Sequence, residues 1–91
     1  MRDSNATVVV SGTTNIDTFV TVQNFPQPGE TTIAKPGIEA LGGKGANQAA
    51  ACAHMGVNTV LLSAVGNDPQ GELALKQLRE HGVNTDYIVI L

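Results

Sequence analysis

Two glycine-rich stretches of this sequence carry the polar side chains best suited to binding a ligand. In the segment LGGKGAN, Gly42 and Gly43 precede Lys44 and Asn47, and small residues follow. Glycines at a helix start let a ligand approach backbone N–H groups that have no partner inside the helix, and Lys44 and Asn47 add directional donors. The segment therefore predicts a site for an oxygen-rich ligand, or else a glycine turn that only caps a helix.

The second stretch is SGTTNID, which contains Asn15 and Asp17 and follows the apolar run at 7–10. In α/β sheets, ligands bind at the carboxyl ends of strands. The Asp17 carboxylate can accept hydrogen bonds from two neighbouring hydroxyl groups, as sugar recognition requires, and charge-assisted bonds are about twice as strong as neutral ones. Both residue types also commonly cap turns, so a purely structural role stays open.

Known nucleotide-binding loops do not fit the glycine segment. A P-loop requires Lys after the second glycine, but Gly43 follows Gly42, and no Ser or Thr follows Lys44. A dinucleotide fingerprint requires a third glycine where Gln48 stands. We therefore expect no nucleotide site in this chain. We also expect no metal site, because the sequence has one cysteine, two histidines and no Cys-x-x-Cys.

The elements that position these residues read as an α/β pattern. Thr7–Val10 predicts a strand buried on both faces, 57–64 predicts a second strand, and 86–91 begins a third. An alanine-rich helix follows Lys44 and ends before Gly56, and a second helix begins at Asp68-Pro69 and ends at Gly82. The sequence GVNT follows each helix, which predicts parallel strands joined by right-handed crossovers.

Between Asp17 and Leu41 the pattern changes to short polar strands and turns. The segment FPQPGET breaks the first of these strands, and Pro36-Gly37 interrupts the return strand, which favours a sheet edge. These residues predict a protruding two-stranded flap.

Composition narrows the classes of protein. The chain has 91 residues, a net charge of −3 with scattered cations, no apolar run near the roughly 20 residues that cross a bilayer, and no secretory signal. A cytoplasmic protein without a nucleic-acid or membrane partner is expected. Cys52 is expected to be a small buried filler and Met55 a core residue, while His54 and His81 lie where cations suit helix dipoles.

Together these segments resemble the ribokinase family of carbohydrate kinases, the phosphofructokinase-B type. The resemblance covers nearly the whole chain: Gly-x-x-Asn-x-Asp at 12–17, FPxPGET at 25–31, GGKGANQA at 42–49 and VGxDxxG at 65–71. It implies a ribokinase-like three-layer αβα fold with a Rossmann-like parallel sheet and a small β-sheet lid. It also implies that the sugar hydroxyls bind to the following residues: Asn15, Asp17, Gly42, Gly43, Lys44 and Asn47.

By this resemblance the full enzyme transfers the ATP γ-phosphoryl group to the 5-hydroxyl of D-ribose and forms a homodimer through the lid. The general base, Mg-ATP and a monovalent cation, potassium, are expected in a C-terminal half that this chain lacks. Residues 1–91 are thus expected to be an incomplete N-terminal portion with the lid inserted at about 17–41, because the chain stops inside an apolar run at Leu91. A complete small domain with a frayed last strand is the alternative.

Two other functions stay open at this stage. The acceptor could be deoxyribose, another sugar or a nucleoside. If the chain truly ends at Leu91, a non-catalytic remnant or dimerisation module fits better, because no catalytic residue of the family lies within it.

Overall fold

A computed structural model describes residues 6–35 and 37–91. The elements, in chain order, are β1 (Thr7–Ser11), β2 (Asn15–Thr18), β3 (Thr21–Val22), β4 (Ala34–Lys35), β5 (Glu39–Gly42), α1 (Lys44–His54), β6 (Asn58–Leu62), β7 (Ala64–Val65), α2 (Pro69–Glu80) and β8 (Val89–Ile90). Neither helix in the described ranges is long and apolar enough to cross a membrane.

A parallel sheet forms the centre of the fold, as the sequence predicts. β1 pairs with β6 from Thr7 opposite Asn58 to Ser11 opposite Leu62, and β7 pairs in parallel with β8. A bridge from Val60 to Asn84 joins the last segment to the other edge of β6. The two GVNT repeats consequently lie side by side, and the Asn84 N–H donates to the Thr59 carbonyl at 2.9 Å.

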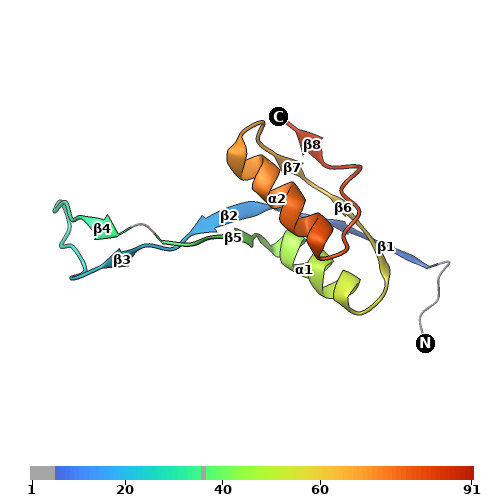
Figure 1. The fold of residues 1–91 in the computed structure, drawn as a ribbon, viewed down its shortest axis with the longest axis horizontal. Coiled ribbons are helices and arrows are strands. Elements are labelled where there is room, and N and C mark those ends of the chain that lie inside the picture. Colours follow the sequence, from blue (N-terminus) through green and yellow to red (C-terminus); the bar gives the residue numbers. More distant parts are fainter. Residues whose placement is uncertain (1–5, 36) are drawn as a thin grey trace.

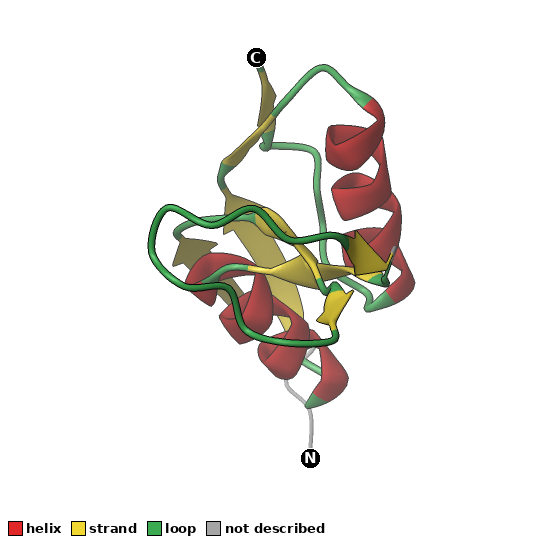
Figure 2. Ribbon diagram, turned by 90° about the vertical axis from the view of Figure 1, so that its left-hand side faces the viewer, coloured by secondary structure: helices red, strands yellow, loops and turns green. Residues whose placement is uncertain are grey.

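Helices α1 and α2 cover one face of this sheet (Figures 1 and 2). A single apolar cluster fills the space between them and the strands, with Leu61 and Leu78 fully buried at its centre. The small side chains of Ala46 and Ala49 face the sheet and are also completely buried, which lets α1 approach the strands closely. Two of the three layers expected for the fold class therefore lie within the described residues.

Two sequence predictions about burial are wrong. β1 is buried on one face only, since Val10 is 8% exposed but Val9 is 59% exposed on the face that no helix covers. Met55, expected in the core, is 80% exposed, because it is the C-cap of α1 and projects beyond the last turn that packs on the sheet. Cys52 is half-buried and free.

The flap extends away from the helices and the parallel sheet (Figure 1). β2 pairs antiparallel with β5, and β3 pairs antiparallel with β4 further out. The flap reverses in a turn in which the Glu30 N–H donates to the Gln27 carbonyl, and Gly29 takes the left-handed φ of 78° that this turn requires. Of the predicted Pro36-Gly37 interruption, Pro36 lies outside the described residues.

The predicted helix ends are confirmed. The Asp68 carboxylate accepts a hydrogen bond from the Gly71 N–H at 2.7 Å, and Pro69 is the first residue of α2. Gly56 and Gly82 follow the two helices with φ values of 85° and 88°. Each of these signals acts within a few residues of chain, so the sequence was sufficient to place them.

Candidate functional site

The start of α1 lies directly against the loop that leaves β1. A β-carbon added to Gly45 would lie 2.7 Å from the Gly12 Cα and 2.8 Å from the Thr13 N, so only glycine permits this approach. The Ala46 N–H donates to the Thr13 carbonyl at 3.0 Å, which satisfies one of the unpaired donors of the first helical turn. The two glycine-rich stretches of the sequence therefore form one site.

Asp17 and Gly42 lie in contact within this site. Their strands run antiparallel, with Asn15 opposite Gly42 and Asp17 opposite Ala40. The Asp17 carboxylate lies over Gly42, in the space that a β-carbon at that position would occupy. Gly42 is itself buried, whereas Asn15 and Asp17 are exposed. Because Gly42 has no side chain, the Asp17 carboxylate can occupy this space.

The N-terminus of α1 adds donors beside this carboxylate. Gly43 caps the helix with a φ of 95°, no side chain accepts a hydrogen bond there, and the first turn contains no acidic residue. Lys44 is the first helical residue and is exposed, as is Asn47. A lysine at this end opposes the helix dipole, so its position is unfavourable for the helix alone and suits an electron-rich ligand.

The six predicted site residues therefore converge on the junction of β2, β5 and α1. Asn15 and Asp17, two residues apart in one strand, face the same side of the flap root, while Ile16 and Leu41 pack against the core. The junction combines a carboxylate acceptor, an amide side chain and the helix donors. This set can bind several hydroxyl groups of one small molecule.

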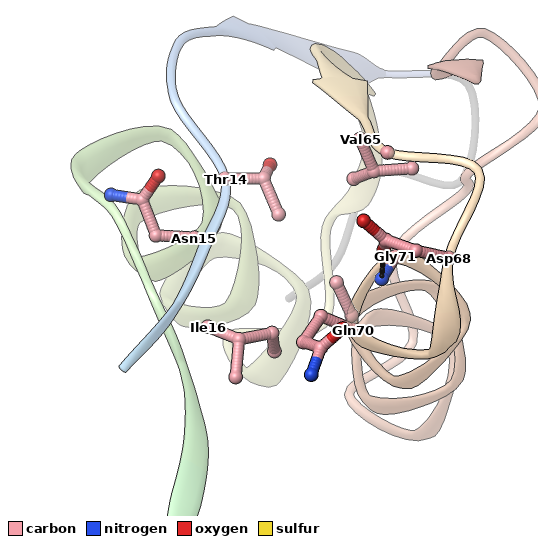
Figure 3. Close-up of a pocket in the computed structure, with 9 residues that line it drawn as sticks. Thr14, Asn15, Ile16, Val65, Asp68, Gln70 and Gly71 are labelled. Carbon is pink, nitrogen blue, oxygen red and sulfur yellow. Dashed lines mark hydrogen bonds between the residues drawn. The ribbon is translucent and has the colours of Figure 1, made fainter. Parts of the chain in front are cut away.

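A shallow pocket of about 130 Å³ lies on the other side of β2 (Figure 3). Thr14 points into it from the loop and Ile16 from β2, and Gln70 and Asp68 approach it from the start of α2, whereas the Asn15 side chain points away (Figure 3). The Asp68 carboxylate already accepts the Gly71 N–H. We therefore place the candidate ligand site at the junction and not in this pocket.

Sequence reasoning missed residues that hold the junction in place. The Ser63 hydroxyl donates to the Gly12 carbonyl at 2.7 Å and lies 2.8 Å from the Thr14 hydroxyl. Gln77, on α2, accepts the Leu41 N–H at 3.0 Å. These partners are 36 to 51 residues apart in the chain, and no local pattern signals such pairs.

The two histidines also contact each other, which the sequence did not indicate. His54 Nε2 lies 2.8 Å from His81 Nδ1, and the ring centroids are 5.0 Å apart. These two distances place the two nitrogens nearly on the line that joins the ring centroids, so they face each other. They share a hydrogen bond and do not both point at one metal ion. Within residues 6–35 and 37–91, no group of three or more His, Cys, Asp or Glu side chains could hold a metal ion.

Fold and site together define an α/β protein with a polar junction of carboxylate, amide and glycine-rich helix start at the carboxyl end of its first strand, and a β-flap beside it. The chain belongs to the pfkB family of carbohydrate kinases, whose family model matches residues 5–91.

Among its relatives, the ribokinase of Staphylococcus aureus (strain COL) is 40% identical over 83 residues and that of Bacillus subtilis (strain 168) is 38% identical over 81. These matches cover 90% and 89% of this chain but 27% and 28% of the two relatives. A deoxyribokinase of Salmonella typhi is 33% identical over 81 residues, which cover 89% of this chain and 26% of the relative. The chain thus spans about a quarter of the length of these proteins.

Solved structures confirm the ribokinase-like fold. The ribokinase from Cryptococcus neoformans var. grubii serotype A, in complex with ADP, superposes with a TM-score of 0.84 over 96% of this chain and 27% of that one, at 37% identity. The Arabidopsis thaliana ribokinase complexed with ribose and ATP superposes with a TM-score of 0.80 over 90% of this chain and 27% of that one, at 39% identity.

Proposed function

We propose that this chain is the N-terminal, sugar-binding portion of a longer ATP-dependent kinase that phosphorylates the 5-hydroxyl of D-ribose, with lid strands inserted at about 17–41. The observation that carries the proposal is the placement of the Asp17 carboxylate over Gly42, two residues before the start of α1, where no side chain makes a cap hydrogen bond. Membership of a carbohydrate kinase family and the similarity to a ribokinase complexed with ribose and ATP support it.

In this proposal the residues of the junction bind and orient the acceptor sugar. Asp17 accepts hydrogen bonds from two hydroxyl groups, and Asn15 binds beside it. Lys44 and Asn47 donate to sugar oxygens, Gly43 lets the sugar approach the backbone, and Gly42 contributes by leaving room for the Asp17 carboxylate. Phosphoryl transfer depends mainly on alignment and charge stabilisation, so fixing the acceptor oxygen is a direct contribution to the reaction.

Within the described residues, no cluster of three or more acidic, histidine or cysteine side chains could hold a metal ion, and the Asp68 carboxylate is engaged as a helix cap. We propose no catalytic residue in this chain. The general base, the Mg-ATP site and the potassium site belong to the remainder of the proposed enzyme.

The flap supports a further part of the proposal, a homodimer formed through the lid. Its large apolar side chains are exposed, namely Phe19, Val20, Phe25, Ile33 and Ile38. Large exposed apolar side chains gathered in one protruding segment are candidates for an interaction surface. We place the proposed enzyme in the cytoplasm, where it would use cytoplasmic ATP.

A sugar panel tests the function. The full-length protein is assayed by coupled ADP release with D-ribose, deoxyribose, fructose and nucleosides, and D-ribose should give the highest kcat/KM. Deoxyribose as the best acceptor would favour the second candidate, which the similarity to a deoxyribokinase supports.

The Asp17→Ala variant tests the site in the same assay. It should raise the KM for the sugar by at least about 100-fold, since two charge-assisted bonds of about 1.5–3 kcal/mol each are lost, while the KM for ATP stays near wild type. Unchanged sugar kinetics would contradict the assignment. If the full-length protein dimerises but none of the acceptors tested leads to ADP release, the non-catalytic dimerisation module becomes the better description.

A further inference from the structure

Gln77 connects α2 to the root of the flap. It is half-buried in the last turn of the helix, and its Oε1 accepts the Leu41 N–H at 3.0 Å. Leu41 directly precedes Gly42, the residue over which the Asp17 carboxylate lies. A side chain outside every glycine-rich segment is therefore bonded to the backbone next to the candidate sugar site.

The geometry of β5 explains why this bond is needed. Leu41 lies opposite Ile16 in the β2–β5 pair, and backbone groups along a strand point alternately to its two edges. Because the Leu41 N–H donates to Gln77, it points to the edge away from β2, where the described residues provide no other strand. A partly buried N–H without a partner is unfavourable. Removing the Gln77 acceptor should therefore let this edge of β5 move away from α2.

The other attachments of the flap root to the helical layer are packing contacts. β2 contacts α2, β5 contacts both α1 and α2, and Ile16 and Leu41 pack on the core cluster. These apolar contacts are not directional, whereas the Gln77 hydrogen bond ties one backbone N–H of β5 to one position on α2. A small shift or rotation of β5 would change how Gly42, and the carboxylate above it, lie relative to the start of α1.

We propose that Gln77 is a positioning residue for the sugar site: its hydrogen bond to Leu41 fixes the flap root and thereby places Asp17 and Gly42 for binding. This inference rests on the proposed sugar-kinase function. Gln77 does not touch the sugar. It acts through the backbone of β5.

The test compares four variants of the full-length protein. Gln77→Leu removes the acceptor, Gln77→Asn keeps an amide that is one methylene too short, and Gln77→Glu keeps an acceptor at the right length. Lys76→Leu is the control, because Lys76 is exposed on the same helix and pairs with the exposed Glu80 at 4.0 Å. Hydrogen exchange of the Leu41 amide, thermal unfolding and the separate kcat and KM for sugar and ATP are measured for each.

Gln77→Leu and Gln77→Asn should speed exchange of the Leu41 amide and raise the sugar KM, each by about 10-fold, with kcat changed less and the KM for ATP unchanged. Gln77→Glu should restore both values to within about twofold, and Lys76→Leu should leave them unchanged. If Gln77→Leu fails to fold, the Asn and Glu variants carry the comparison.

Faster Leu41 exchange with an unchanged sugar KM would overturn the proposal, because Gln77 would then be structural only. Unchanged exchange would overturn it as well. A wild-type protein that phosphorylates no sugar would refute the proposed function instead, and normal Leu41 protection in that protein would distinguish the two failures.

Discussion

The contact between Asp17 and Gly42 gives the sharpest prediction, the effect of Gly42→Ala. A β-carbon at this position would collide with the Asp17 carboxylate and would lie 2.7 Å from its Cγ and 3.0 Å from Oδ1. Gly42 is not among the glycines with positive φ, so alanine fits the backbone without strain. The substitution therefore acts on one side chain, and that side chain is exposed and able to rotate away.

The magnitude follows from what the displaced carboxylate loses. If rotation breaks one of its two charge-assisted bonds to the sugar, about 1.5–3 kcal/mol is lost, and the sugar KM should rise about 10- to 100-fold. The free energy of unfolding should change by less than about 1 kcal/mol, because the tip of a flexible side chain moves and alanine in a strand costs less entropy than glycine. The KM for ATP should not change.

A double-mutant cycle isolates the effect. In an Asp17→Ala background the collision no longer exists, so adding Gly42→Ala should change the sugar KM by less than about twofold. Gly82→Ala is the matched control. Gly82 has a φ of 88°, and an added β-carbon would meet only the Ala53 Cβ, at 3.8 Å. Alanine there should cost about 1–2 kcal/mol of stability and leave sugar binding unchanged.

The measurements are coupled ADP release at varied sugar concentration and urea unfolding of the same full-length proteins. Two results would refute the reasoning. In the first, Gly42→Ala leaves the sugar KM at the wild-type value. In the second, it raises KM equally with and without Asp17, which would mean that the methyl group blocks the sugar directly.

Further predictions concern the supports of the site and the core. Gly45→Ala should lower the free energy of unfolding by about 1–3 kcal/mol and also raise the sugar KM, because its β-carbon would overlap the backbone of Gly12 and Thr13; a neutral result in both assays would contradict the close approach. Asp68→Ala should cost about 1 kcal/mol in urea unfolding through loss of its bond to the Gly71 N–H, and a changed sugar KM would show a role beyond capping. Leu78→Ala, at a fully buried position, should cost about 2–5 kcal/mol in the same measurement, and a smaller loss would mean that the cluster can collapse around the cavity.

Much of the fold follows from signals that act over a few residues. The Asp68-Pro69 helix start and the glycines after each helix were predicted correctly, since a cap needs only neighbouring backbone groups. The repeated GVNT segments predicted parallel strands, and these lie side by side. The flap was predicted from its turn residues.

Burial was harder to predict because it depends on which face of an element is covered. The apolar run of β1 is typical of a strand buried on both faces, yet the described residues place helices on one face only, and Val9 is exposed. Met55 has the composition of a core residue but lies past the last packed turn of its helix. The sequence gives the hydrophobicity of a side chain but not which residues pack against it in the folded chain.

The sequence by itself determined which residue types could bind a sugar: a carboxylate, two glycines at a helix start, and the donors that follow them. Their roles stay a prediction. Only the tertiary structure decided that Asp17 lies over Gly42, that Gly12 meets Gly45, and that residues outside the glycine segments, Ser63 and Gln77, hold the junction. The physical reason is the separation along the chain of the residues that make each contact. Caps and turns are decided by bonds between near neighbours in the chain, whereas these contacts form only after crossovers bring distant segments to the same edge of the sheet.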